Sequence, residues 1–189
     1  MAFPDIADAI RGAEALDPPA TFRYRANTRH RYERLRRLPA GLLALGDAVC
    51  SFNPVYGQGM TVAAMQAHAL RAHLAERPAI DPLRYFGHIA KVISVPWDMT
   101  IGADLANPGV IGKRTPTVRM INAYIRQLHA ASTDPALAVA FTRVSGLAAP
   151  PQSLLRPDRL VRVIAGNYRS ANAATRPTNV RMSTTNEGE

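Results

Sequence analysis

The sequence predicts an α/β arrangement in which one or a few strands precede a mostly helical C-terminal region. Two observations lead to this prediction. Residues 42–45 are continuously apolar, as in a buried strand. From Gly59 onward, segments with apolar residues at helical spacing are separated by prolines. With 189 residues, of which 47% are apolar and 20% charged, the chain can bury the core of one globular domain.

The segment before this predicted strand carries weaker signals. Residues 4–16 have apolar side chains at helical spacing, and Asp17-Pro18-Pro19 would end that helix. Residues 21–25 alternate aromatic and polar side chains, which is typical of a strand. Residues 27–37 are the most basic stretch. We expect this stretch to be a solvent-exposed strand and turn, although contact with an anionic cofactor or substrate is an alternative.

The chain is organised around residues 42–60. Gly46 and Asp47 follow the predicted strand, so a carboxylate lies at its C-terminal end. The turn that follows contains Gly57 and Gly59 and opens an alanine-rich helix. This order of elements is how α/β proteins hold anionic nucleotide cofactors, because helix N–H groups attract negative charge and glycine lets a ligand approach the backbone.

The alanine-rich helix is predicted to extend to about Glu76 and to lie on a sheet through its apolar face. Gln66 and His73 fall outside that face, and His68 and His73 are not spaced to share a metal ion, so we expect both histidines to face solvent or play a supporting role. The face predicted to be buried comprises Met60, Ala63, Ala64, Ala67, Leu70 and Leu74.

Four more helices are predicted in the C-terminal region. Asp81 and Asp134 each precede a proline and have the pattern of helix N-caps. The predicted helices cover residues 81–95, with a restart at Pro96, then 116–131, 136–147 and 157–165. The expected organisation is a lead-in (1–41), a strand–turn–helix segment (42–78), a helical region (79–167) and a disordered tail (168–189).

Composition restricts the possible function. The net charge is +9, but no helix-turn-helix, zinc-finger or RNA-binding pattern accompanies it, so nucleic-acid binding is a minor alternative. No metal-ligand spacing is present, and no apolar run is long enough to span a membrane. Cys50 is the only cysteine, and residues 1–5 do not resemble a signal peptide, so we expect a cytoplasmic protein.

A family resemblance names the cofactor. Gly46-Asp47-Ala48, followed by Pro54-Val55-Tyr56-Gly57-Gln58-Gly59-Met60, resembles the second FAD-binding motif, GD…PxxGxG, of flavin-dependent aromatic hydroxylases and epoxidases. The resemblance implies an α/β fragment of an FAD/NAD(P)-binding Rossmann-like flavoprotein. It implies that Asp47 binds the ribityl or ribose hydroxyls of FAD and that the turn lies along the pyrophosphate and flavin ring. The implied cofactor-binding residues are Gly46, Asp47, Pro54, Gly57, Gln58, Gly59 and Met60.

The implied activity is that of an FAD-dependent monooxygenase. In that family NAD(P)H reduces the flavin, and a flavin hydroperoxide hydroxylates or epoxidises a small organic substrate. No residue of this chain is identified as catalytic. The alternatives are a flavin-dependent reductase or halogenase of the same superfamily, and a non-enzymatic helical module that no longer binds flavin.

One part of the family pattern is absent. Members begin with a βαβ unit carrying G-x-G-x-x-G, which holds the ADP half of FAD, and this sequence has no such motif. We therefore expect a C-terminal portion that works with a missing N-terminal portion or a partner chain. Alone, this portion is expected to bind FAD weakly or not at all.

Overall fold

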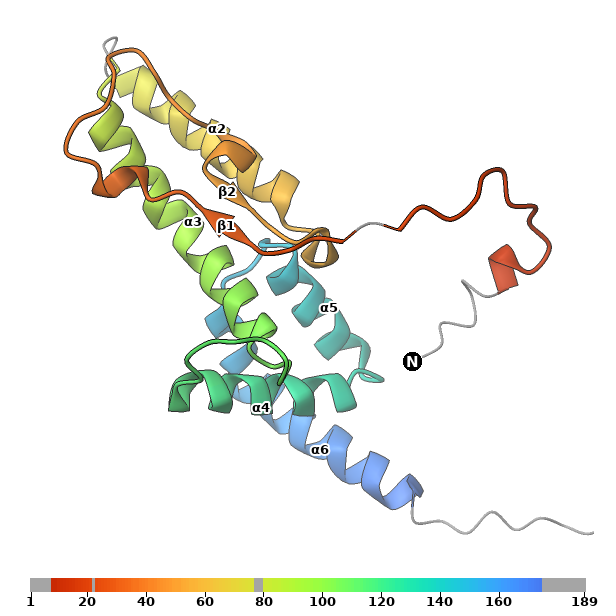
Figure 1. Ribbon diagram of the computed structural model, residues 1–189. Coiled ribbons are helices and arrows are strands. Elements are labelled where there is room, and N and C mark those ends of the chain that lie inside the picture. The colour runs from red at the N-terminus through yellow and green to blue at the C-terminus, as the bar shows by residue number, and fades with distance from the viewer. Residues whose placement is uncertain (1–7, 22, 77–79, 175–189) are drawn as a thin grey trace, which may run out of the picture.

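The computed structural model describes residues 8–21, 23–76 and 80–174. Most of the described chain is helical, and one small sheet lies beside the first long helices (Figure 1). The α-helices are α2 (Gly59–Glu76), α3 (Pro82–Asp104), α4 (Pro116–Ala130), α5 (Pro135–Ser145) and α6 (Pro157–Ala174). The 3-10 helices are η1 (Tyr32–Arg34), η2 (Gly46–Ala48), η3 (Pro54–Tyr56) and η4 (Pro151–Leu155).

The sheet has two short antiparallel strands, β1 (Thr28–Arg29) and β2 (Cys50–Ser51). The predictions of strands at residues 42–45 and 21–25 are therefore wrong; residue 22 lies outside the described residues. Residues 42–45 are apolar enough for a strand, but no strand of the described chain lies beside them to complete their hydrogen bonds. The described residues contain no parallel strand pair, so a Rossmann-like sheet stays a prediction for a larger protein.

The first described residues do not form the predicted helix. Only residues 8–10 of the range 4–16 are helical, and residues 1–7 lie outside the described residues. Every residue from 8 to 21 is exposed, and this segment runs away from the helices (Figure 1). An amphipathic pattern produces a stable short helix only when its apolar face finds a surface to pack on, and here it finds none.

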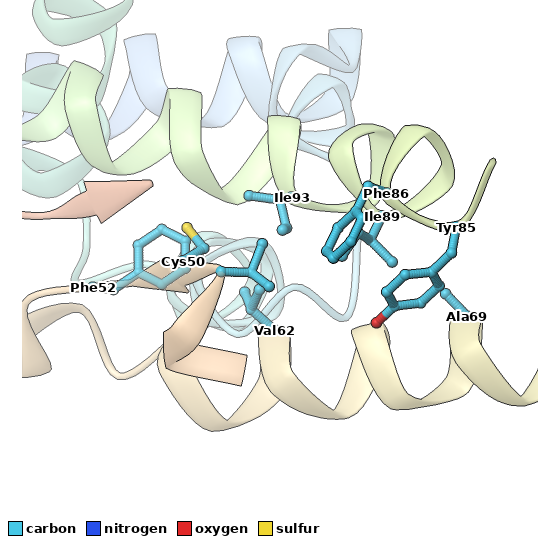
Figure 2. Close-up of a cluster of buried hydrophobic side chains, with 9 residues drawn as sticks. Cys50, Phe52, Val62, Ala69, Tyr85, Phe86, Ile89 and Ile93 are labelled. Atoms are coloured by element: carbon cyan, nitrogen blue, oxygen red, sulfur yellow. The ribbon is translucent and has the colours of Figure 1, made fainter. Parts of the chain in front are cut away.

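The main core lies between α2 and α3. Tyr85, Phe86, Ile89 and Ile93 of α3 point toward Val62 and Ala69 of α2, and Cys50 and Phe52 close one end (Figure 2). The ring of Tyr85 packs edge-on against Phe86, with 5.2 Å between centroids. This cluster fixes α2 and the β2 segment against α3.

The buried face of α2 is rotated away from the predicted one. The buried side chains of α2 are Val62, Gln66, Ala69 and His73. Of the predicted face, Leu70 packs against the main core, half-buried. Met60 is 88% exposed and Leu74 41% exposed, and Ala64 and Ala67 are exposed as well. The sequence pattern identified an apolar stripe, but which stripe is buried depends on the neighbouring element.

Three helices begin with the same device. Asp81, Thr115 and Asp134 are the N-caps of α3, α4 and α5, and each side chain accepts a hydrogen bond from a backbone N–H of the first turn. A proline follows each cap, at a position where its missing N–H costs nothing. The helix predictions at Asp81 and Asp134 are confirmed.

The predicted restart at Pro96 is wrong, because α3 continues through it to Asp104. Pro96 removes one donor from the helix, but its ring is buried. Tertiary packing therefore outweighs the local preference for a break. The continuous α3 reaches both groups of helices, since Met99 packs against the second core.

The second core lies among α4, α5, α6 and η4. Leu137, Ala140 and Val144 of α5 are buried there, as the helical spacing predicts. Helix α6 is longer than predicted and continues to Ala174, so residues 168–174 are helical rather than a disordered tail. Residues 175–189 lie outside the described residues. Within the described chain, no helix combines the length and the apolar character needed to cross a bilayer.

Truncating the centre of the main core should destabilise the fold. Ile89 is 1% exposed at the contact of α3 with α2. Ile89→Ala is expected to lower the free energy of unfolding in urea by about 2–5 kcal/mol, because it removes buried methyl groups and leaves a cavity. Leu83→Ala, at a position of α3 that is 44% exposed, is the control and should cost less than about 1 kcal/mol. Equal effects would contradict this description of the core.

Candidate functional site

The candidate site is the turn that leads into α2. Asn53 is the N-cap of η3, and its side chain accepts a hydrogen bond of 3.1 Å from the N–H of Val55. Pro54 takes the first position of η3, where proline is favoured. Gly57 ends η3 with φ +64°, a left-handed conformation that glycine adopts without strain. The chain then enters α2 at Gly59.

The N-terminus of α2 offers unpaired backbone donors. The first bond into the helix runs from the N–H of Val62 to the carbonyl of Gln58, at 2.9 Å. Among the described residues, the N–H groups of Gly59, Met60 and Thr61 have no hydrogen-bond partner. Such groups, together with the positive end of the helix dipole, attract an anion.

The surface beside these donors is open. A Cβ atom added to Gly57 or to Gly59 would meet no other atom within 4 Å. Gly57 is explained by its positive φ, but Gly59 has neither a positive φ nor a packing neighbour that would require glycine. At Gly59 the space that a side chain would occupy is therefore open beside the first turn of α2.

A partly buried polar network holds the turn in place. The carboxylate of Asp104, at the end of α3, accepts hydrogen bonds from the hydroxyl of Tyr56 and, at 2.6 Å, from the side-chain amide of Asn27. The oxygen of that same Asn27 amide accepts from the N–H of Asn53 at 2.6 Å. Burial and the bond to Asp104 raise the pKa of Tyr56 well above its usual value, so the phenol stays protonated and donates.

The positioning roles of these residues were not predicted, although Tyr56 lies within the quoted motif. Asn27, Tyr56 and Asp104 lie far apart in the chain, and no spacing rule joins them. The signal that could have suggested them is a set of polar residues beside apolar segments, which only becomes specific when the tertiary contacts are known.

Gln58 is turned into the protein. Its side chain is 5% exposed, and its Nε2 donates to the carbonyl of Ser145 at 2.9 Å. Its Oε1 accepts from the hydroxyl of Thr100 at 3.3 Å. Of the predicted cofactor residues, Gln58 can therefore contribute only its backbone, while its side chain ties the turn to α3 and to the end of α5.

Gly46 and Asp47 lie further along α2 than the glycine turn. The N–H of Gly46 donates to the Oε1 of the buried Gln66 at 3.0 Å, and Gly46 itself has φ +63°. A Cβ atom added to Gly46 would lie 3.8 Å from the Cβ of Ala63. Asp47, the second residue of η2, is exposed. The structure thus brings η2 against the same helix whose N-terminus forms the glycine turn.

The basic stretch is mainly exposed, as expected, with one exception. Arg34, Arg36 and Arg37 face solvent. The side chain of Arg29 is 5% exposed and donates to the carbonyl of Ala90 at 3.0 Å, so it joins β1 to α3. Burial lowers the pKa of Arg29, although not enough to remove its charge. This arginine is part of the core and not available to a ligand.

The histidine expectation is half right. His68 is exposed, but His73 is 4% exposed and packs edge-on against Tyr85. The Nε2 of His73 and the Nε2 of Gln66 are both buried without a hydrogen-bond partner among the described residues. Within that part of the chain, no three His, Cys, Asp or Glu side chains are placed to hold a metal ion.

Part of the chain is similar to a curated protein. No protein-family model matches the chain. The chain is 34% identical over 141 residues to Protein Rv3254 of Mycobacterium tuberculosis (strain ATCC 25618 / H37Rv), an alignment that includes 71% of this chain. The chain spans 30% of the length of that relative. The chain therefore corresponds to a part of this longer protein and not to the whole of it.

Removing the carboxylate at the centre of the polar network should loosen the turn. Asp104→Ala leaves the hydroxyl of Tyr56 and the amide of Asn27 without their acceptor, and is expected to lower the free energy of unfolding by about 1–3 kcal/mol. The control is Asp98→Ala, which changes an exposed residue of the same helix and should cost less than about 0.5 kcal/mol. Urea unfolding followed by circular dichroism measures both. A loss no larger than that of the control would contradict a role for Asp104 in holding the turn.

The only cysteine should be unreactive in the folded chain. Burial raises the pKa of the Cys50 thiol to about 11, from 9.0. At about pH 8 the folded chain therefore holds almost no thiolate, and iodoacetamide should modify Cys50 far faster in denaturant than in native buffer. Because the thiol ionises more readily when unfolded, stability should fall as the pH rises above about 9. Rapid labelling of the native chain would contradict the burial.

Proposed function

We propose that residues 46–60 form the second half of an FAD site, and that the longer protein is an FAD-dependent monooxygenase. The observation that carries this proposal is the set of unpaired N–H groups at the start of α2, beside the open surface of Gly57 and Gly59. The glycines of the GD…PxxGxG pattern fall at the ends of helical elements: each one ends or begins such an element.

The geometry suits the anionic part of FAD. A pyrophosphate is held well by backbone N–H groups at a helix N-terminus, where the dipole favours negative charge. Gly59 permits close approach, and the exposed side chain of Met60 can cover an apolar ring. The side chain of Gln58 is engaged elsewhere, which restricts its contribution to the backbone.

Asp47 is suited to bind hydroxyl groups. It is exposed, and no hydrogen bond engages its carboxylate among the described residues. A free carboxylate accepts hydrogen bonds from sugar or ribityl hydroxyls. Its neighbour Gly46 bonds to Gln66 of α2, so Asp47 lies beside the helix that begins at the glycine turn.

The exposed face of α2 supports a larger assembly. Met60, Ala64, Ala67 and Leu74 form an apolar stripe on the side of α2 that faces away from α3. The flavoprotein resemblance implies a sheet on that side. The alignment with this chain covers only 30% of the relative, so the relative has room for such a sheet. We therefore propose that an N-terminal portion or partner chain covers this stripe and completes the site.

The roles of this chain are binding and orientation. FAD, when bound, supplies the oxygenation chemistry, with NAD(P)H as the reductant and a small organic molecule as the substrate. The N–H groups of Gly59 to Thr61 hold negative charge, Asp47 holds hydroxyls, and the network on Asp104 keeps the turn rigid. A reductase or halogenase of the same superfamily would use these residues in the same way.

An NMR titration of the chain with FAD tests the proposal. Backbone amide shifts detect weak binding, which is expected because half of the site is provided by another portion. The shifts should cluster at residues 57–61 and at Asp47, and should saturate only above about 1 μM FAD. No shift at the start of α2 would contradict the proposed site, and sub-micromolar affinity would contradict its being half a site.

Two variants of one exposed residue test the charge requirement. Met60→Glu places a carboxylate at the N-terminus of α2, which favours the helix but repels a pyrophosphate. FAD affinity should fall about three- to tenfold relative to Met60→Gln, which has the same size without the charge. Thermal unfolding should show that both variants are folded. Equal FAD affinity of the two variants would contradict pyrophosphate binding at this helix.

A variant of the predicted hydroxyl ligand completes the test. Asp47→Ala should weaken FAD binding and leave the affinity for inorganic pyrophosphate unchanged, because Asp47 is assigned to the hydroxyls alone. Its exposure means that the free energy of unfolding should change by less than about 0.5 kcal/mol. Unchanged FAD affinity would contradict the role of Asp47.

A further inference from the structure

A cavity of about 370 Å³ lies among α5, η4 and the beginning of α6. None of its lining residues belongs to the candidate flavin site, so its function is a separate question. Three arginines, one serine and four apolar residues line it: Arg143, Arg156, Arg159, Ser153, Ala136, Val139, Ala140 and Ala149.

The cavity is strongly basic. Three guanidinium groups come from α5, from the residue before α6 and from the first turn of α6, and no acidic side chain lines the cavity. Arg156 forms an exposed ion pair with Asp158 at 3.5 Å. Arg143 has no ion-pair or hydrogen-bond partner for its guanidinium among the described residues. Like charges gathered around one space repel one another, and an anion between them would relieve that repulsion.

One hydrogen bond fixes an arginine of the cavity wall to the backbone of the serine. Nη1 of Arg159 donates to the backbone carbonyl of Ser153 at 2.5 Å, which anchors one guanidinium and leaves its other N–H groups free to donate. The Oγ of Ser153 is buried and has no hydrogen-bond partner among the described residues. Because this oxygen is closed to solvent, a ligand in the cavity would meet the guanidinium groups and not this hydroxyl.

The lining of the cavity is also partly apolar. Val139 and three alanines line it together with the arginines. A cavity that has both charged and apolar side chains suits a ligand with both characters. A simple inorganic ion would make no use of the apolar side chains.

We propose that this cavity binds a small organic anion, with a phosphate or carboxylate group at Arg143 and Arg159 and a short apolar group against Val139. Guanidinium groups bind both kinds of oxyanion through paired N–H groups. The proposal does not depend on flavin, since it concerns different residues and a different part of the fold.

Binding of simple probes to the full chain tests the proposal. Phenyl phosphate and benzoate carry the two anionic groups on the same ring, and benzyl alcohol is the neutral analogue. Isothermal titration calorimetry without FAD should show saturable binding of at least one anion and none of the alcohol. The stronger of the two anions identifies the headgroup. Failure of both anions to bind, or equal binding of benzyl alcohol, would overturn the proposal.

Variants locate the binding. Arg143→Ala should lower the affinity of the bound anion about tenfold or more, because a charge-assisted hydrogen bond is lost. Arg126→Ala, which removes an exposed helical arginine of α4 outside the cavity, is the matched control and should leave the affinity unchanged. Equal effects of the two substitutions would mean that net charge alone attracts the anion, and would overturn the proposal.

Discussion

The packing of α2 against α3 is the interaction on which the rest of the structure depends. Val62 and Ala69 on one helix and Ile89 and Ile93 on the other exclude water from their contact (Figure 2). Burial of apolar surface is the dominant favourable term in folding, and this contact orients α2 as a rigid body. The position of the glycine turn follows, since the turn is the beginning of α2.

Polar contacts refine what the apolar contact establishes. Asp104 lies at the far end of α3 and holds Tyr56 and Asn27, while Gln58 bonds to the last residue of α5. These bonds are made in places where an unpaired polar group would be costly, so the turn has little freedom to move. A pre-organised turn loses less entropy when it binds a ligand. The network thus connects the fold to the proposed cofactor site.

The two proposed anion sites have different physical sources. At α2 the attraction would come from backbone N–H groups and the helix dipole, which require only a helix start and small residues. In the cavity beside α5 it would come from guanidinium groups. Part of the net charge of +9 is therefore concentrated at the cavity, where an anionic ligand could use it.

Much of the secondary structure could be predicted from local chemistry. The caps at Asp81 and Asp134 and the beginning of α2 at Gly59 depend on residues within one turn of each other, and all three are confirmed. The prediction of a break at Pro96 is wrong, because a buried contact outweighed the missing hydrogen bond. The prediction of a strand at residues 42–45 is wrong, because a strand requires a neighbour that no local pattern supplies.

The sequence by itself determined the position of the glycine turn, the helix starts and the residues proposed to meet a cofactor, since these depend on backbone conformation over a few residues. Only the tertiary structure decided which side of α2 is buried, and it buried Gln66 and His73 while leaving Met60 in solvent. It also brought Asp104 to Tyr56 and gathered the three arginines beside α5. The physical reason is that burial and polar pairing are relations between distant segments, which no spacing within one segment records.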